Sequence, residues 1–293
     1  MNEITKKLLK LVSDWSGTFP GAYHIREDGC SAGVRSSDRI HIESKTDRPG
    51  LEIRILPETV GETVSIPACV THGDVDDLVY NDFFVGDDCD VTIVAGCGIH
   101  NCGVQNSQHD GIHTFHVGKN ARVRYIERHY GEGDGNGENI MNPTTVVELD
   151  EGSYMEMETT QIKGVDSTVR VTRATLGPDA TLIIHEKVMT HGKQHAKSDF
   201  TVDLNGAGCH TNVISRSVAR GQSHQVFMAR INGNAPCYGH SECDAIIMDQ
   251  GVVSAIPEVT ANCLDAQLVH EAAIGKIAGE QLTKLMTLGL TEK

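Results

Sequence analysis

The residues best suited to chemistry in this sequence are its cysteines and histidines. There are nine cysteines and 15 histidines among 293 residues. Thiolates and imidazoles together bind borderline or soft metals such as zinc and iron. In a reducing compartment, an odd and irregularly spaced set of cysteines indicates metal or sulfur chemistry more than disulfides. We expect about half of the cysteines to be small buried hydrophobes, because that is the usual place of a free thiol.

One dense group is the segment CGIHNCGVQNSQHDGIHTFH at 97–116, which begins with Cys97 and Cys102 and contains four histidines. It lacks the Cys-x-x-Cys pair of a zinc finger. His113 and His116 are separated by an odd number of residues, so on one strand they would face opposite sides. The segment is therefore as consistent with structural histidines as with a metal site.

A second dense group is CYGHSECD at 237–244, which contains two thiols and three further potential ligands: Cys237, His240, Glu242, Cys243 and Asp244. In an extended chain these two thiols have the same parity, so both can face one side of a sheet. A third group, HEAAIGK, places His270 beside Glu271. A thiolate, an imidazole and a carboxylate from these segments would form an open metal site with exchangeable ligands. Spacing alone gives no reason for the segments to meet in space.

The overall composition excludes several classes of protein. The chain has 25 basic and 40 acidic residues, and its net charge of −15 repels the phosphate backbone of nucleic acids. No run of about 18 apolar residues could span a membrane, and the first residues lack a secretory signal. The phosphate-binding loop Gly-x-x-x-x-Gly-Lys-Ser/Thr and the nucleophile motif Gly-x-Ser-x-Gly are both missing. We expect a cytoplasmic protein that has neither nucleic acid nor a membrane as a partner.

The elements that must position these residues are short strands. From about residue 24 to 260, runs of β-branched residues alternate polar and apolar positions, the period of half-buried strands. Turns of one style recur with steps of 32, 34, 25 and 29 residues, marked by Gly86, Gly118, Gly152, Gly177 and Gly206. A stacked solenoid has this signature, because each coil buries its apolar face only against its neighbours. A β-sandwich or cupin-like barrel is the competing architecture, although Asn-Gly and Asp-Gly hairpin turns are rare here.

The two ends of the chain differ from this pattern. Residues 3–15 form an amphipathic pattern that predicts a helix packed on the main domain. After residue 260 the β pattern fades, and an apolar stripe of Ile277, Leu282, Leu285 and Met286 predicts a terminal helix. We therefore expect an N-terminal helix in residues 1–20, a β-core in 21–264 and a C-terminal segment in 265–293.

The stretch SRSVARGQSHQVFMARINGNAPCYGHSECDAIIMDQGVVSAIPEVTANCLDAQLVHEAAIGKI at 215–277 resembles the core of the SufB/SufD proteins of iron–sulfur cluster assembly. Ordered motifs carry the resemblance: a Ser-Arg turn, a Cys-Asp strand, a Pro turn and a His-Glu-Ala box before the terminal helix. Upstream, AGCGIHNCG and HVGKNARVRYIERHYGEG resemble the family's Gly-Cys segment and its following strand. The similarity covers roughly residues 60–290.

This resemblance implies a right-handed parallel β-helix that pairs through its last coils, here as a homodimer. It implies a SufC-type ABC ATPase as a partner, docked at the C-terminal segment, and apo-proteins as recipients. The cargo would be a transient iron–sulfur cluster, of the 4Fe–4S type. Carried over residue by residue, the scaffold thiol falls on Cys243, the carboxylate on Glu271 and a histidine ligand on His270.

The same resemblance assigns the residues of sulfur transfer. The sulfur-accepting cysteine falls on Cys97, with Cys102 as a close substitute. As our own hypothesis, Cys237 and Cys263 are second-choice metal ligands. The implied function is a scaffold for cluster assembly and transfer, and not an enzyme. Two alternatives stay open: a metal-dependent β-solenoid or cupin-like enzyme that uses residues 97–116, and a SufD-like structural partner without a cluster of its own.

Overall fold

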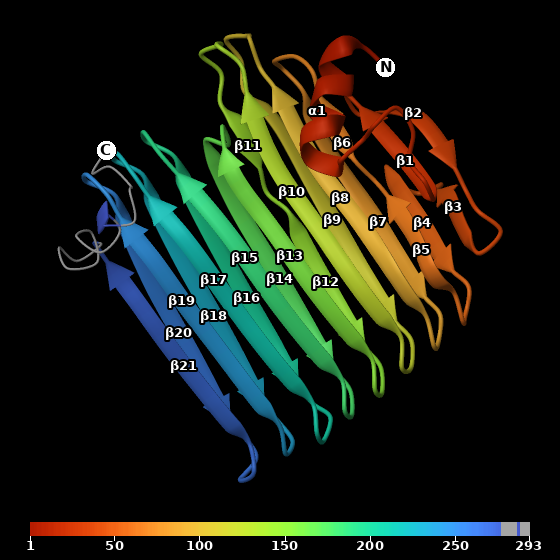
Figure 1. Ribbon diagram of the computed structural model, residues 1–293, viewed down its shortest axis with the longest axis vertical. Coiled ribbons are helices and arrows are strands. Elements are labelled where there is room, and N and C mark those ends of the chain that lie inside the picture. Colours follow the sequence, from red (N-terminus) through yellow and green to blue (C-terminus); the bar gives the residue numbers. More distant parts are fainter. Residues whose placement is uncertain (277–285, 288–293) are drawn as a thin grey trace.

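The chain folds into a parallel β-solenoid of about eight turns (Figure 1). The computed structural model describes residues 1–276 and 286–287. Consecutive strands alternate between two sheets, so that each coil adds one strand or a broken pair of strands to each sheet. The solenoid that the repeated turns predict is therefore confirmed, and the sandwich or cupin-like alternative is wrong.

Within the described residues the first sheet, sheet A, has 11 strands. They are β1 Ala22–Glu27, β2 Cys30–Arg35, β5 Val60–Ser65, β6 Ala68–Val70, β8 Asp90–His100, β10 Arg122–Glu132, β13 Tyr154–Lys163, β15 Thr181–Thr190, β17 His210–Ala219, β19 Tyr238–Ile247 and β21 Gln267–Gly275. The second sheet, sheet B, has ten in the same part of the chain. They are β3 Ile40–Ser44, β4 Gly50–Ile55, β7 Asp76–Val85, β9 Ser107–Val117, β11 Asn139–Met141, β12 Thr144–Leu149, β14 Ser167–Leu176, β16 His195–Leu204, β18 His224–Gly233 and β20 Val252–Ala261.

The coils stack in register, so that equivalent residues of successive coils lie beside one another. Arg122 of β10 pairs with Asp90 of β8 on one side and with Tyr154 of β13 on the other. Phe83 pairs with Phe115 in the same way, and their rings stack with centroids 4.5 Å apart. Such ladders repeat one environment from coil to coil, which is why the sequence shows a loose period.

The first end of the solenoid is closed by two hairpins. The strand pairs β1–β2 and β3–β4 are antiparallel, whereas all the later pairs described are parallel. β2 and β3 are the outermost strands of their sheets at this end. A hairpin here covers the open edge of a stack that would otherwise pair with another chain. At the opposite end β20 and β21 are the last strands described in their sheets.

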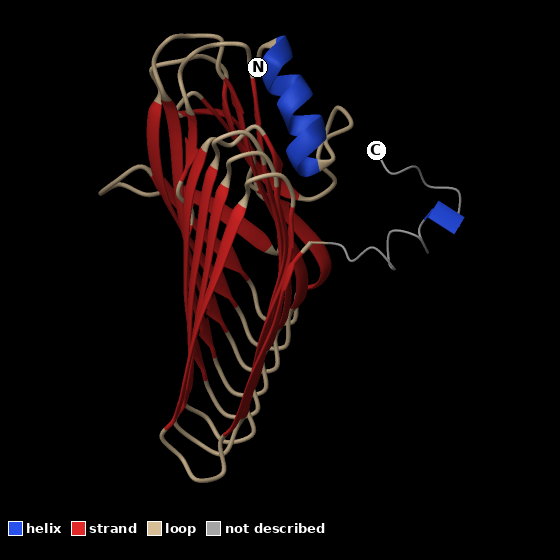
Figure 2. Ribbon diagram, turned by 90° about the vertical axis from the view of Figure 1, so that its left-hand side faces the viewer, coloured by secondary structure: helices blue, strands red, loops and turns tan. Residues whose placement is uncertain are grey.

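Helix α1 (Glu3–Ser13) packs on the outside of sheet A (Figure 2). The Asn2 side chain caps it by accepting a hydrogen bond from the Thr5 amide at 2.8 Å. Leu8 and Val12 are fully buried against β8, where Gly96 has no side chain to obstruct the helix. The predicted docking of this helix on the main domain is confirmed. In the described part of the chain, no helix has the length and apolarity needed to cross a bilayer.

The predicted C-terminal helix needs a correction. We expected helix from residue 265, but Gln267–Gly275 is strand β21, which pairs in parallel with β19. The hydrogen bonds that β19 offers outweigh the helix propensity of a Glu-Ala-Ala segment. His270 and Glu271 therefore lie on a strand. Ile277, Leu282 and Leu285 of the expected apolar stripe lie outside the described residues.

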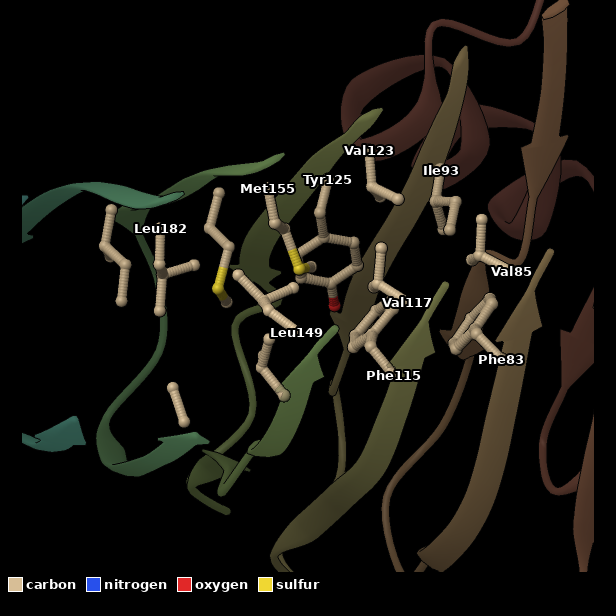
Figure 3. Close-up of a cluster of buried hydrophobic side chains, with 14 of the residues drawn as sticks. Phe83, Val85, Ile93, Phe115, Val117, Val123, Tyr125, Leu149, Met155 and Leu182 are labelled. Carbon is tan, nitrogen blue, oxygen red and sulfur yellow. The ribbon is translucent and has the colours of Figure 1, made fainter. Parts of the chain in front are cut away.

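The interior between the sheets is divided into an apolar half and a polar half. Sheet A strands begin with apolar inward side chains and end with polar ones; β10, for example, carries Val123 and Tyr125, then Glu127 and His129. Sheet B strands run in the reverse order, so that their polar positions come first. Figure 3 shows the apolar half, where aliphatic side chains and a few rings fill the space. The polar half holds the groups that can do chemistry.

Candidate functional sites

The polar half of the interior contains charged residues that the sequence analysis did not single out. Glu127, Arg170 and Glu186 are each less than 5% exposed, on three different strands. The sequence does contain a pattern that could have identified these three residues. Each has the parity of its strand's apolar positions, as Glu186 does with Leu182 and Ile184, so alternation alone would have predicted charges that face inward.

Cys97 lies at the upstream end of this polar interior, beside a chain of ion pairs. The Arg26 guanidinium donates two hydrogen bonds to the Asp77 carboxylate, with Nη2 to Oδ1 at 2.6 Å and Nε to Oδ2 at 2.8 Å. Asp77 Oδ2 also lies 3.0 Å from His109 Nδ1. His109 also interacts with the Cys97 thiol and lowers its pKa. The order thiol, imidazole, carboxylate is that of an activated nucleophile.

A second histidine contacts the same thiol from the neighbouring coil. His129 pairs in register with Cys97 and interacts with its sulfur. Its Nε2 atom lies 3.4 Å from Glu127 Oε1, and the other oxygen of Glu127 accepts a short hydrogen bond from Arg170. Two imidazoles, each backed by a carboxylate, therefore face one buried sulfur.

These contacts favour the ionised forms of both partners. Burial by itself would raise the pKa of the Cys97 thiol, but His109 and His129 lower it to about 6. Burial would lower the pKa of His109, but Cys97 and Asp77 raise it to about 10. At neutral pH the pair is therefore a thiolate beside an imidazolium, the state in which a cysteine is nucleophilic.

Cys97 and His109 also line a cavity of about 290 Å³ at the capped end of the solenoid. The buried part of its wall includes His24 and His113, whose pKa values burial lowers to about 4, so that both are neutral at pH 7. The exposed part includes Arg48 of the β3–β4 hairpin loop. The cavity therefore extends from the surface to a buried thiol.

From this end, polar side chains continue through the interior towards the last coils. Arg170 Nε lies 3.6 Å from Glu186 Oε1, and the hydroxyls of Ser198 and Ser215 donate to the Glu186 carboxylate at 2.5 and 2.7 Å. Ser215 pairs in register with Cys243. The cavity beside these serines measures only about 10 Å³, so the row is packed and not an open channel.

Cys243 lies at the downstream end of this row. It faces the interior on β19, one coil before the last strand of sheet A, and only 1% of it is exposed. Burial, with Glu186 and Asp244 nearby, raises the pKa of its thiol to about 11. Cys243 is therefore a neutral thiol, in contrast to Cys97. Only β21 separates its position from the open end of sheet A.

His270 and Glu271 lie on opposite faces of β21. His270 faces inward, as Cys243 does, and its Nδ1 atom lies 2.7 Å from the Ser241 hydroxyl. Burial lowers the pKa of His270, which keeps this imidazole neutral and able to bind a metal. Glu271 faces outward and is exposed. The chain thus places the predicted thiol and imidazole on one side of the strand, and the predicted carboxylate on the other.

On that outer face Glu271 meets two further potential ligands. Within the described residues one set of three candidate metal ligands, His240, Glu242 and Glu271, has its ligand atoms within 4.8 Å of one another. His240 Nε2 lies 3.7 Å from Glu271 Oε2, and His240 Nδ1 is held by Asn212 Oδ1 at 2.9 Å. A histidine held in this way at Nδ1 presents Nε2 to a metal. The sequence singled out His240 and Glu242 in the group at 237–244, but spacing could not predict that they meet Glu271, which lies on the neighbouring coil.

The other predicted residues lie apart from these groups. Cys237 is buried on the same side as Cys243, as its parity predicts, but it lies just before β19, beside Cys209 of the preceding coil. Cys102 lies on an exposed loop after β8, with its sulfur 3.1 Å from His100 Nε2. His116 is half-buried on the outer face of β9, and its Nδ1 atom lies 2.7 Å from Glu148 Oε2. Some of the cysteine and histidine side chains of the segment 97–116 therefore lie in the interior, and others lie at the surface.

Comparison with known proteins agrees with this fold. A family model described as "SUF system FeS cluster assembly, SufBD core domain" matches residues 81–293, more than half of the chain. An iron–sulfur cluster assembly SufBD family protein of Methanocaldococcus jannaschii is 29% identical over 266 residues, which cover 88% of this chain and 82% of that protein.

Two further relatives carry the same family name. The protein of Archaeoglobus fulgidus is 31% identical over 250 residues, or 84% of this chain. A protein of Methanothermobacter thermautotrophicus strain Winter is 25% identical over 258 residues, or 85% of this chain. The matched regions span 65% and 61% of these two relatives, slightly less than two thirds of their length.

Proposed function

Because this chain belongs to the SufBD family of the SUF system for iron–sulfur cluster assembly, we propose that it is a scaffold on whose last coils a cluster is built and from which it is handed on. The observation that carries this proposal is the arrangement around β21. A thiol, two imidazoles and two carboxylates flank the last strand described in sheet A, within two coils. These are the ligand types that iron takes from proteins.

The scaffold acts as a pair of chains joined at the last coils. Val259 is 45% exposed, whereas Ile231, its register partner one coil earlier, is 1% exposed. Ile274 is 38% exposed against 5% for Ala245, its own register partner. Inward-facing apolar side chains, and a strand edge that no described residue pairs with, favour association with a partner of the same shape, here a second copy.

Cluster assembly requires Cys243 to meet ligands that lie across β21. In the single chain its thiol is sealed inside, while Glu271 lies outside. We assign the rearrangement to a SufC-type ABC ATPase that docks at the C-terminal segment 265–293. Its closure would strain the paired last coils, shift β21 and bring thiol, imidazole and carboxylate onto one cluster. Carboxylate and imidazole ligands exchange more readily than thiolate, which allows a 4Fe–4S cluster to pass to a recipient apo-protein.

Sulfur enters this scheme at Cys97. Its thiolate is suited to accept sulfur, and the buried polar row through Glu127, Arg170 and Glu186 leads from it towards Cys243. Polar side chains stabilise a charged sulfur species in an interior that would otherwise exclude it. Because the row is closely packed, passage requires the coils to move, as they would during the ATPase cycle.

Anaerobic reconstitution with iron(II) and sulfide, followed by desalting, tests the ligand assignment. The Cys243→Ser variant is expected to retain less than about a tenth of the wild-type iron and sulfide, because serine is a poor ligand for iron. The matched control is Cys89→Ser. Cys89 is also a buried thiol, but it lies several coils away from Cys243 and hydrogen-bonds the Leu56 carbonyl. Full cluster uptake by the Cys243→Ser protein would remove Cys243 from the site.

A further inference from the structure

The cavity at the capped end is larger and has more polar wall residues than a thiol needs in order to accept a sulfur atom. It is about 290 Å³ in volume, about the lower limit for binding a small molecule. Its wall carries Cys97 and His109 at the buried end, with Ser44 and Arg48 at the exposed end. The β1–β2 and β3–β4 hairpins enclose it, and both precede the residues that the family model matches.

One wall residue shows that the cavity is built for a polar occupant. Asn81 is 5% exposed, and its side-chain nitrogen lies 3.3 Å from His113 Nε2. Its side-chain oxygen is buried and has no hydrogen-bond partner. An unsatisfied buried acceptor is costly, and a ligand that carries an N–H or S–H donor would satisfy it.

The mouth of the cavity favours an anion. Arg48 is exposed there, and its surface ion pair with Asp47, at 3.5 Å, is of the weak kind. Lys45 also lines the cavity and is held by Asp82 at 2.5 Å. A carboxylate on a small ligand would meet Arg48 on entry and leave the ligand's other end near the thiol.

We propose that this cavity binds a small persulfide of amino-acid size, and that Cys97 takes the donor's sulfane sulfur with His109 and Asp77 as positioning residues. The inference rests on the proposed role of Cys97 as the sulfur entry point and adds the donor class and the entry route. A donor cysteine carried on a protein would have to reach a thiol that is only 6% exposed, behind two hairpins. A free small molecule meets no such obstacle.

The chemical step balances without an outside oxidant or reductant. The Cys97 thiolate attacks the outer sulfur of the donor, R–S–SH, and a new sulfur–sulfur bond forms as the donor's own sulfur–sulfur bond breaks. The electron pair of the broken bond leaves with the donor sulfur as RS⁻, which takes the proton of the His109 imidazolium. The products are a Cys97 persulfide and the thiol RSH.

The pH dependence of Cys97 reactivity is set by the titratable and charged groups around its sulfur. Those that face its sulfur are His109 from β9 and His129 from β10, whereas Cys69 of β6 lies nearby on the opposite face of sheet A. Asp77 and Arg26 lie behind the first histidine, and Glu127 and Arg170 lie behind the second.

The positioning role is tested by alkylation of Cys97 with iodoacetamide across pH, followed peptide by peptide in a mass spectrometer. In the wild-type protein the half-maximal rate is expected near pH 6. In His109→Gln it is expected at about pH 8.5 or above, the range of an ordinary thiol. The matched control is His116→Gln, which removes a half-buried histidine from the opposite face of β9. An unchanged midpoint in a folded His109→Gln protein would overturn this role.

The entry route is tested with L-cysteine persulfide as the probe, measured as the gain of one sulfur atom on the Cys97 peptide. Ser44→Trp narrows the mouth without altering the buried ion pairs, and it should slow sulfur transfer at least about tenfold. Thr46→Trp, two residues further along on the exposed β3–β4 loop but outside the cavity wall, should leave the rate unchanged. Equal rates in wild type and Ser44→Trp would overturn entry through this cavity and favour a protein-bound donor.

This outcome is separable from failure of the scaffold function. Reconstitution with free sulfide supplies sulfur without the persulfide step. A protein that forms a cluster from free sulfide but takes no sulfur from L-cysteine persulfide at Cys97 would refute the donor site and leave the scaffold proposal intact. A protein that takes up sulfur at Cys97 but forms no cluster would refute the scaffold proposal and leave the donor site intact.

Discussion

Arg170 joins the two acidic groups of the buried polar row. It contacts Glu127 on one side and Glu186 on the other, and all three side chains are at most 5% exposed. A buried charge is tolerated only when it is paired, and here one guanidinium neutralises carboxylates from two coils. The polar interior between Cys97 and Cys243 therefore depends on this residue.

Replacement of Arg170 by Met is expected to lower the free energy of unfolding by about 3–5 kcal/mol, because two buried carboxylates lose their cation. Arg124→Met is the control, since Arg124 makes an exposed ion pair with Glu158 at 2.6 Å and should cost at most about 1 kcal/mol. Urea unfolding of the two variants and the wild type measures both values. An equal loss of unfolding free energy in the two variants would show that Arg170 does not neutralise the two buried carboxylates.

Single residues also show where prediction from sequence succeeds. Parity predicted that Cys237 and Cys243 share a side and that His113 and His116 do not, and the structure confirms both. It could not predict that Cys97 meets His109 and Asp77, because these residues come from three strands of two sheets. Contacts of that kind depend on the register of the coils, which the sequence period gives only loosely.

At the level of elements, α1 depends on close approach to one glycine. A Cβ atom on Gly96 would lie 2.3 Å from the Val12 carbonyl oxygen, which is backbone and has little room to move. The helix buries Leu8, Leu9 and Val12 completely. Loss of that packing exposes side chains that each contribute about 1.5–3 kcal/mol when buried.

Gly96→Ala should therefore release α1 from sheet A while the coils remain folded. Hydrogen exchange of the amides in residues 5–13 would rise to that of an isolated short helix, which is marginally stable in water. Gly33→Ala serves as the control, because its Cβ would meet the Tyr23 ring at 3.6 Å and Ile25 Cδ1 at 3.9 Å, both ordinary contact distances. Protection of α1 that stays unchanged in Gly96→Ala would contradict this account of helix docking.

The last strand shows why one element could not be predicted. The sequence around His270 and Glu271 has good helix propensity, and its alternation is weak because Ala272 and Ala273 are both small. Pairing with β19 decides its conformation, and that pairing is visible only once the coils are stacked. As a consequence His270 and Glu271 face opposite sides, which adjacent residues of a strand must do.

At the scale of the whole molecule, the two ends of the solenoid differ. The upstream end is closed by hairpins and holds the cavity of Cys97, whereas the downstream end exposes inward-facing apolar side chains. The repeated turns predicted the stack itself but could not predict this polarity, because it depends on which strands lack a neighbour. Sulfur entry at one end and cluster assembly at the other is the division of labour that we propose.

Pairing at the downstream end predicts a dimer in solution. Val259→Glu places a charge on the uncovered end of the stack and should shift the protein to monomer, as measured by analytical ultracentrifugation. Val169→Glu is the matched control, since Val169 is 42% exposed on the outer face of β14 in the middle of the stack. A Val259→Glu protein that remains dimeric would move the interface elsewhere.

The scaffold claim is tested most directly by the wild-type protein incubated anaerobically with iron(II) and sulfide and then desalted. The measured quantities are the iron and acid-labile sulfide bound per chain and the visible absorption spectrum. The account predicts equal amounts of iron and sulfide and the broad absorption of an iron–sulfur cluster. Iron bound without sulfide, or no uptake of either, would contradict it.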